Sequence, residues 1–296
     1  MSARIAPVVD AAWLAAHLHD GDLVVVDATT LTGAPGGGPH AVGSGRAGYE
    51  AEHVPGALFA DLTTDFADTE APEPWTVPSS EKFAVQAGLL GIGVDSRVVV
   101  YDRSTGFWAT RLHWQLRLEG FDDVAVLDGG LRAWKSAGER VTADPTPDPI
   151  AAAFQAERRP ELLRSTEEVA KSLDDPGTVL VAVLDPDARR GEVRAYAREG
   201  HIPGSVVLPP AEILDPATGG PRPVGELRAT FERAGLLDPG VTPVAYSGHG
   251  IAATGVAYAL VLAGRDDVAV YDGSMAAWAA DDSLPLVTGD SPGGDA

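Results

Sequence analysis

A strand, a tight loop and a helix are encoded in one stretch, Pro243-Val-Ala-Tyr-Ser-Gly-His-Gly-Ile-Ala-Ala-Thr254. The apolar run that ends at Tyr246 predicts a buried strand, and the glycines that follow it break the strand. The apolar segment from Ile251 to Gly264 is long enough for a helix. A strand that enters a helix through such a loop directs backbone N–H groups into one small space, which favours negative charge. Ser247 is the residue that the loop would present to a ligand.

Three blocks of sequence occur twice in the same order, at nearly one offset. This indicates a duplicated domain rather than an array of short repeats. We expect a first domain over residues 1–145, a linker rich in proline and alanine over 146–163, and a second domain over 164–296. The repeated blocks are Asp122-Asp-Val-Ala-Val-Leu-Asp-Gly-Gly-Leu-Arg-Ala-Trp134 with Asp266-Asp-Val-Ala-Val-Tyr-Asp-Gly-Ser-Met-Ala-Ala-Trp278, His53-Val-Pro-Gly56 with His201-Ile-Pro-Gly204, and Val98-Val-Val-Tyr-Asp102 with Pro243-Val-Ala-Tyr-Ser247.

Short apolar runs alternate with helical patterns in both halves. The alternation predicts α/β domains, each with a mainly parallel sheet covered by helices on both faces. Ligands of such sheets bind at the carboxyl ends of the strands, where the Ser247 loop is expected. The expected strands cover residues 23–27, 98–101, 124–127, 179–184, 242–246 and 268–271.

The composition excludes several classes of partner and chemistry. The 296 residues are 45% hydrophobic, and their net charge of −21 disfavours nucleic acid and anionic membranes as partners. No cysteine occurs, which excludes disulfides, thiolate ligands and thiol chemistry. The N-terminus lacks the apolar core of a signal peptide, and no apolar stretch is long enough to span a bilayer, so we expect a cytoplasmic protein. No acidic or histidine cluster has a metal-binding spacing, and we expect neither a metal nor a cofactor.

The chain resembles the two-domain rhodaneses, the family of thiosulfate and 3-mercaptopyruvate sulfurtransferases. The resemblance rests on the tandem layout, the two His-x-Pro-Gly blocks, the Asp-Gly blocks that end in Trp134 and Trp278, and the strand, loop and helix after Tyr246. It implies tandem rhodanese-like domains, each with a mainly parallel five-stranded sheet, and an active-site loop at residues 247–252. In that family the loop begins with a cysteine that carries sulfur as a persulfide. Here Ser247 stands at that position, and Asp102 at its counterpart in the first half.

Other positions also depart from the family pattern. A serine common two residues into the loop of mercaptopyruvate enzymes is His249, and Trp75 replaces a histidine of the inter-domain loop. The family motif Asp-x-Arg, whose arginine helps to hold the substrate, reads Asp185-Pro-Asp187 when matched to Asp27-Ala-Thr29. A register two residues later reads Asp187-Ala-Arg189 and keeps the arginine. We prefer the first alignment, in which Asp187 replaces the arginine and removes an anion clamp.

The candidate catalytic residues are Ser247, His249 and Asp187. A serine hydroxyl cannot store sulfane sulfur, so persulfide transfer is not expected. The three residues supply the types needed for a nucleophile, base and orienter, which would permit hydrolysis or acyl transfer. In a second interpretation, His249 or Asp187 is the general acid or base and Ser247 donates a hydrogen bond. The residues expected to contact a small polar substrate are Gly248, Gly250, Ile251, Ala252, Trp75, Arg189, Arg190 and Asp61.

Three functional interpretations remain open. The first is an enzyme repurposed for thiol-free acid/base or hydrolytic chemistry on a small polar metabolite, and the second is a silent binding or regulatory module. The third is a sulfurtransferase with an engineered cysteine-to-serine change, which the coordinated departures disfavour. We expect a monomer or weak dimer. Elsewhere, His53 and His201 are interpreted as turn residues, Trp134 and Trp278 as core, His40 as exposed, and residues 281–295 as a mobile tail.

Overall fold

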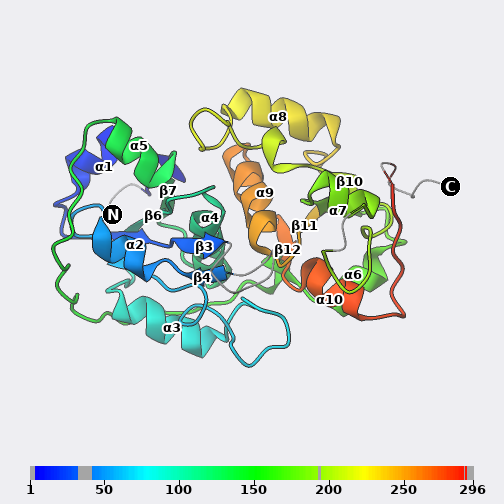
Figure 1. Ribbon diagram of the computed structural model, residues 1–296, viewed down its shortest axis with the longest axis horizontal. Helices are drawn as coiled ribbons and strands as arrows, with labels where there is room; N and C mark the ends of the chain where they lie inside the picture. The colour runs from blue at the N-terminus through cyan, green and yellow to red at the C-terminus, as the bar shows by residue number, and fades with distance from the viewer. Residues whose placement is uncertain (1–3, 33–41, 193–194, 290, 292–296) are drawn as a thin grey trace. The chain divides into compact units, whose positions relative to one another are not determined.

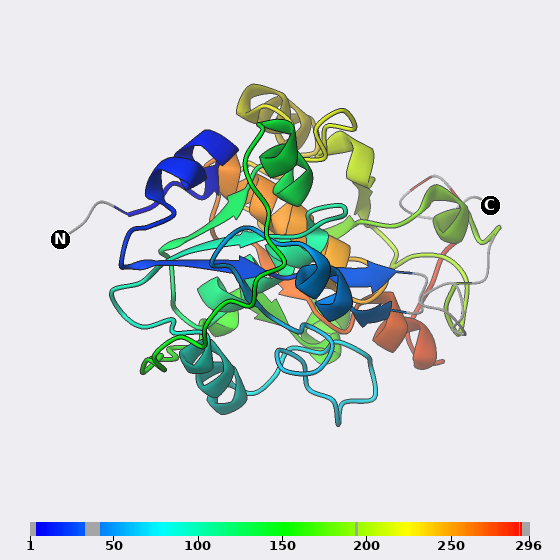
Figure 2. The same cartoon turned by 60° about the vertical axis from the view of Figure 1, so that its left-hand side comes forward.

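Each half of the chain folds around a five-stranded sheet in which every strand pair is parallel. In this computed structural model, which describes residues 4–32, 42–192, 195–289 and 291, the first sheet has the order β1-β7-β6-β2-β5 and the second β10-β9-β11-β12-β8. Each strand has a counterpart at the same place in the other sheet. The predicted α/β class and the duplication are confirmed (Figure 1; Figure 2).

The first sheet is flanked by helices and joined by a small antiparallel pair, β3 with β4. Its central strands, β2 and β6, are rich in valine, as expected for strands buried on both faces. The elements of this half are β1 (Val8–Val9), α1 (Ala11–His17), β2 (Leu23–Asp27), β3 (Thr30–Thr32), β4 (Val42–Ser44), α2 (Arg46–Ala51), β5 (Leu58–Phe59), α3 (Ser80–Leu89), β6 (Arg97–Tyr101), α4 (Phe107–Leu118), β7 (Val124–Leu127) and α5 (Gly130–Ser136).

The second half repeats the plan around β9, β11 and β12. Helix α9, which the apolar segment after the loop predicted, is apolar on nearly all sides and mostly buried. The elements are a 3-10 turn (Pro160–Leu162), β8 (Leu163–Arg164), α6 (Thr166–Ser172), β9 (Thr178–Ala182), α7 (Pro186–Arg190), β10 (Val206–Val207), a second 3-10 turn (Pro210–Glu212), α8 (Val224–Arg233), β11 (Thr242–Tyr246), α9 (Ile251–Leu262), β12 (Ala269–Tyr271) and α10 (Ser274–Ala280).

The chain divides into two units that do not follow its order completely. The first unit holds residues 1–159 together with 216–220, and the second holds 160–215 and 221–296. Residues 152–159 join the first unit by backbone hydrogen bonds, such as Ala152 N–H to Gly88 O at 2.9 Å and Arg159 N–H to Leu118 O at 2.7 Å. The segment expected to be a linker thus runs along the first unit over these residues.

A tyrosine at the end of the central strand ties each sheet to its His-x-Pro-Gly turn. The hydroxyl of Tyr101 accepts the backbone N–H of Val54 at 3.2 Å, and that of Tyr246 accepts the N–H of Ile202 at 3.1 Å. The second tyrosine also lies 2.8 Å from the hydroxyl of Ser205. These bonds fix the strand end that immediately precedes the loop in each unit.

The two tryptophans assigned to the core are buried, at 1% exposure for Trp134 and 0% for Trp278. The indole of Trp278 donates to the carbonyl of Pro285 at 2.8 Å, and Val287 exchanges two backbone hydrogen bonds with His201. The expected mobile tail is therefore wrong for residues 284–287, because their apolar side chains and backbone pair with the second core. Residues 292–296 and His40 lie outside the described part of the chain.

Candidate functional site

Strand β11 delivers Ser247 to the carboxyl edge of the second sheet, and helix α9 begins four residues later, at Ile251. Gly250, just before the helix, has a φ of 77°, in the left-handed region that glycine adopts without strain. A Cβ at this position would lie 2.7 Å from the carbonyl oxygen of Asp272. The loop thus requires glycine at position 250 and passes close to the turn that follows β12.

That turn fixes the backbone of Ser247. The N–H of Ser247 donates to the hydroxyl of Ser274 at 3.1 Å, and its carbonyl accepts the N–H of Met275 at 3.0 Å. The Ser274 hydroxyl donates in turn to the carbonyl of Tyr271 at 2.7 Å. Ser247 itself is 2% exposed. The candidate nucleophile is therefore held in place by a residue that the sequence analysis did not single out.

Ser274 has a φ of 50°, which is unusual for any residue other than glycine. Its counterpart in the first unit, Gly130, has a φ of 57°. A residue with a Cβ pays roughly 1–2 kcal/mol for this conformation. The signal was present in the repeat, where Asp128-Gly-Gly-Leu131 stands against Asp272-Gly-Ser-Met275. A serine in a glycine position indicates that its hydroxyl is needed there.

The first unit shows how its copy of the loop holds a negative charge. One carboxylate oxygen of Asp102 accepts the backbone N–H groups of Ser104 at 2.7 Å and Gly106 at 3.0 Å. The other accepts those of Trp108 and Ala109, both at 3.1 Å. The amides of the loop and of the first turn of α4 thus converge on one carboxylate, as expected at a helix N-terminus.

Ser247 stands in the place of Asp102 in the second unit, where the loop is built in a similar way. Gly106 precedes α4 with a φ of 80°, as Gly250 precedes α9 with a φ of 77°. The first loop, residues 102–106, is one residue longer than the second, residues 247–250. Because Ser247 is small and neutral, it brings no carboxylate to the amides of its own loop.

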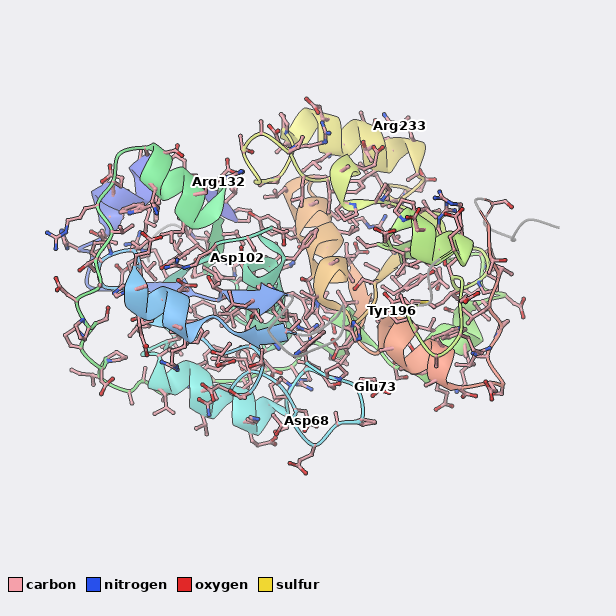
Figure 3. The ribbon with its side chains drawn as sticks, in the orientation of Figure 1. Asp68, Glu73, Asp102, Arg132, Tyr196 and Arg233 are labelled. Atoms are coloured by element: carbon pink, nitrogen blue, oxygen red, sulfur yellow. The ribbon has the colours of Figure 1, made fainter. Side chains whose placement is uncertain are left out.

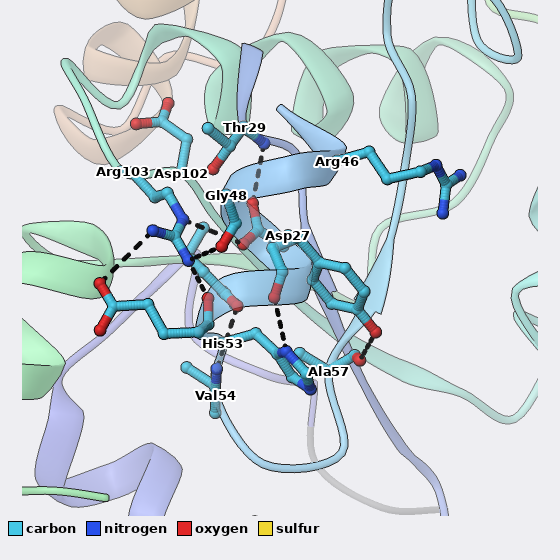
Figure 4. A network of polar contacts seen from close by, with 12 residues as sticks. Asp27, Thr29, Arg46, Gly48, His53, Val54, Ala57, Asp102 and Arg103 are labelled. Carbon is cyan, nitrogen blue, oxygen red and sulfur yellow. Dashed lines mark hydrogen bonds and ion pairs between the residues drawn. The ribbon is translucent and has the colours of Figure 1, made fainter. Parts of the chain in front are cut away.

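An ion pair between a half-buried arginine and a buried aspartate also lies beside the loop of the first unit (Figure 4). The Nε of Arg103 lies 3.8 Å from Oδ2 of Asp27, and burial raises the pKa of the Asp27 carboxyl. In the second unit, Ala182 pairs with the strand-end tyrosine as Asp27 does in the first, and Gly248 follows Ser247 as Arg103 follows Asp102. Small neutral residues thus replace both members of the ion pair.

The strand register corrects the predicted Asp-x-Arg alignment. Asp27 and Ala182 occupy the same register, opposite Tyr101 and Tyr246 respectively. The match of Asp185-Pro-Asp187 to Asp27-Ala-Thr29 is therefore wrong, because Asp185 lies three residues beyond the position of Asp27. Two further buried residues lie between the end of the strand and Asp185. The spacing of the sequence motifs does not reveal this local difference between the two units.

Helix α7 carries the three charged candidates in different environments. The side chain of Asp187 is 55% exposed, and its Oδ1 lies 2.6 Å from a terminal nitrogen of Arg190. Arg189 is instead buried and donates to the carbonyl of Gly289 at 3.0 Å. Asp185 caps the helix by accepting the N–H of Asp187 at 2.9 Å. Asp187 is thus engaged by a neighbouring arginine in solvent, an arrangement that does not resemble a buried orienter.

His249 lies beside a tyrosine that the sequence analysis missed. The rings of His249 and Tyr196 meet edge to face, with 6.0 Å between their centroids. A Cβ at Gly248 would lie 2.4 Å from the Tyr196 hydroxyl oxygen, so this hydroxyl lies against the loop backbone. Ile251 and Ala252 form the first turn of α9 and are partly buried. Tyr196 occurs in an irregular segment without periodicity or motif, which offers no sequence signal.

Trp75 and Asp61 belong to the first unit, and their part in substrate binding stays a prediction. Trp75 has a φ of 63°, and its carbonyl accepts a hydrogen bond from Arg111 at 2.8 Å. Asp61 is 7% exposed. Burial favours a higher pKa for its carboxyl, but hydrogen bonds from Ser44 and Thr63 outweigh burial and hold the pKa below its usual value.

Comparison with known proteins agrees with the duplicated architecture. The rhodanese-like domain family matches residues 10–137 and 165–281. The chain is 34% identical to thiosulfate sulfurtransferase of Rattus norvegicus over 92% of this chain and 91% of the relative. It is 31% identical to thiosulfate/3-mercaptopyruvate sulfurtransferase 1 of Arabidopsis thaliana, over 95% of this chain and 78% of the relative.

Solved structures give the same result. The 3-mercaptopyruvate sulfotransferase SseA of Escherichia coli aligns with a TM-score of 0.79 and 28% identity, over 91% of this chain and 99% of that one. The anaerobic ergothioneine biosynthesis enzyme of Chlorobium limicola, in complex with trimethyl histidine, aligns with a TM-score of 0.81 over 96% of this chain and 71% of that one. At 23% identity, this second likeness concerns the fold alone.

Two α/β units, each with a parallel sheet and with a strand, loop and helix at its carboxyl edge, form the architecture of a tandem rhodanese-like protein. The chain belongs to the rhodanese family and is sulfurtransferase-like, with serine in place of cysteine at the head of its second loop. Among the described residues, none of the helices has the length and apolar character to cross a membrane. In the same part of the chain, no three histidine or acidic side chains gather as metal ligands would.

Proposed function

We propose that this protein binds a small anionic or strongly polar metabolite at the Ser247 loop and does so without carrying sulfur. The absence of cysteine removes the atom on which a persulfide would form. The observation that carries the proposal is the Asp102 carboxylate, which accepts four backbone N–H groups in the equivalent loop. With Ser247 in that place, the same type of loop would accept the negative group from a ligand instead.

The chemistry we favour at this site is proton transfer by His249. Ser247 then acts as a hydrogen-bond donor to the ligand rather than as an attacking nucleophile. A nucleophilic serine needs an oriented base, and Asp187 is poorly suited to orient one because it pairs with Arg190 in solvent. General acid or base catalysis by a positioned histidine contributes about 10²–10⁴-fold to a rate. The substrate would be a small metabolite with an acidic or carbonyl group that fits the amides of the loop.

The same exposed pairing of Asp187 also supports a second candidate function, a binding or regulatory module without turnover. In that case the anion still binds at the Ser247 loop, but replacement of His249 changes affinity only. A screen of pooled metabolites distinguishes the two candidates. Turnover that is lost in His249→Ala identifies an enzyme, whereas binding without turnover identifies the module.

The binding step can be tested with sulfate as the probe, titrated by calorimetry into the full chain at low ionic strength. The unmodified chain is expected to bind it. Ser247→Asp is expected to abolish binding, because its carboxylate would occupy the loop amides as Asp102 does. Ser136→Asp adds the same charge at an exposed position on α5 and serves as the matched control. Equal affinity in Ser247→Asp and the unmodified chain would refute the proposal.

The sulfur step is tested by thiocyanate formation from thiosulfate and cyanide. We expect none from the unmodified chain and little from Ser247→Cys, because the neighbouring positions have also departed from the family pattern. Robust activity on restoring the cysteine would instead favour the interpretation of a sulfurtransferase with a serine change. Robust activity of the unmodified chain would contradict the whole proposal, since a hydroxyl cannot hold sulfane sulfur.

A further inference from the structure

We propose that the hydroxyl of Tyr196 is a specificity-determining group of the Ser247 site and donates a hydrogen bond to the bound anion. The inference rests on the proposed function, because it assigns a donor to the ligand of that same loop. It restricts the ligand to one that offers an acceptor oxygen beside Gly248 in addition to the atoms held by the loop amides.

The position of the hydroxyl follows from Gly248. A Cβ built at this residue would lie 2.4 Å from the Tyr196 hydroxyl oxygen and 3.2 Å from Cζ of its ring. The first distance is too short for a real side chain and the second is tighter than most real Cβ contacts, so glycine at position 248 lets the phenol approach the loop this closely. Figure 3 labels Tyr196 in the second unit, in the region of α9. The residue directly after Ser247 therefore sets the distance of a phenol from the ligand position.

The state of the phenol suits a donor. Burial and the nearby Asp185 carboxylate raise the pKa of Tyr196 to about 12. The hydroxyl accordingly keeps its proton at neutral pH and presents an O–H rather than a phenolate to an anion. A phenolate would repel the ligand that the loop amides attract. Hydrogen bonds to charged groups are about twice as strong as those between neutral groups.

The ring of Tyr196 is supported on two sides. It packs against the second hydrophobic core and meets the ring of His249 edge to face at 6.0 Å. This packing holds the hydroxyl against the loop backbone. It also makes phenylalanine a sharp test, because Tyr196→Phe removes the hydroxyl and keeps the ring in its packing.

The test is calorimetric titration of sulfate into the full chain and four variants. Tyr196→Phe is expected to weaken binding by about tenfold or more, the usual effect of one hydrogen bond to a charged group. Gly248→Ala is expected to weaken it as well, because the new methyl group displaces the phenol. The double variant should bind sulfate only slightly more weakly than either single variant, because both changes remove the same hydrogen bond. Tyr258→Phe removes a phenol hydroxyl from α9 in the same unit and should leave the affinity unchanged.

A spectroscopic readout separates direct contact from a structural role. Sulfate should produce a near-ultraviolet difference signal of a phenol in the unmodified chain and in Tyr258→Phe, but not in Tyr196→Phe. If Tyr196→Phe binds sulfate as tightly as the unmodified chain while Ser247→Asp does not bind it, the Tyr196 assignment is overturned and the proposed function stands. If the unmodified chain binds no sulfate, the proposed function fails and the assignment falls with it.

Discussion

Asp102 accepts the backbone N–H of Gly106 at 3.0 Å, inside a loop that also turns the N–H of Ser104 toward the same carboxylate. In the sequence, this aspartate is only the residue that stands where a cysteine would be. The structure makes it an internal anion that satisfies the start of α4.

Replacement of Asp102 is predicted to destabilise the first unit. Asp102→Ala leaves four buried or half-buried N–H groups without their acceptor, at a cost of about 1–3 kcal/mol in the free energy of unfolding. Urea titration followed by circular dichroism measures the change. Asp95→Ala, at an exposed position, should alter stability by no more than about 0.5 kcal/mol. Equal stability of the two variants would contradict the internal-anion interpretation.

Ser274 carries two opposing effects that can be separated. Ser274→Ala keeps the left-handed backbone penalty and loses the hydroxyl that accepts the Ser247 N–H. Ser274→Gly also loses the hydroxyl but removes the penalty, so it should be more stable than the alanine variant by roughly 1 kcal/mol. Both should bind sulfate more weakly than the unmodified chain. Comparison of urea midpoints gives the stability order, and an alanine variant as stable as the glycine variant would exclude strain at this position.

Replacement by alanine should change the stability of the protein in opposite directions at two glycines of the second unit. Gly250→Ala places a Cβ at a φ of 77° and 2.7 Å from a carbonyl oxygen, and is predicted to cost more than about 1 kcal/mol. Gly225→Ala, within α8 and with open space around it, is predicted to stabilise by about 0.4–1 kcal/mol. Thermal midpoints of the two variants check the prediction, which fails if both shift the same way.

The buried His113 predicts a specific loss of stability in acid. Burial, helped by the nearby Arg117, lowers the pKa of His113 from 6.5 to about 3. Below pH 6.5 the unfolded chain therefore takes up a proton that the folded chain refuses. The stabilising effect is complete above that pH and is lost as the pH falls toward 3, at up to about 1.4 kcal/mol per pH unit.

His113→Phe keeps a ring of similar size and removes this proton. Between pH 7 and 5, the unmodified chain should lose about 2 kcal/mol more of its free energy of unfolding than the variant does. Denaturant titrations at the two pH values measure the difference. His19→Gln, an exposed histidine in the same unit, should run parallel to the unmodified chain. If His113→Phe also runs parallel, the histidine accepts a proton in the folded state.

Much of the fold followed from the sequence because its signals are local and repeated. The strands at 23–27, 124–127 and 242–246 were predicted at their observed bounds, since continuous apolar runs flanked by turn residues leave little choice. The duplication added long-range information, because two copies of one block must occupy equivalent places. The position of Ser247 at the strand end followed from the same reasoning.

The finer parts of the site could not be predicted, for physical reasons. Tyr196 reaches the loop from an irregular segment, and no periodicity marks such a segment. The shift of Asp185 relative to Asp27 depends on how far the strand continues, which the spacing of motifs does not reveal. The role of Ser274 depends on a backbone angle, although a serine opposite Gly130 in the repeat carried the necessary hint.

The hydroxyl of Tyr246 accepts a hydrogen bond from the backbone N–H of Ile202. The residue directly before the loop is therefore bonded to a turn far upstream in the chain. Selection for altered ligand preference should then yield substitutions around His201 and Ser205, although neither is proposed to touch the ligand. Libraries restricted to the residues surrounding the bound molecule would miss them. In this scaffold, substitutions distant from the ligand therefore change the position of the loop that binds it.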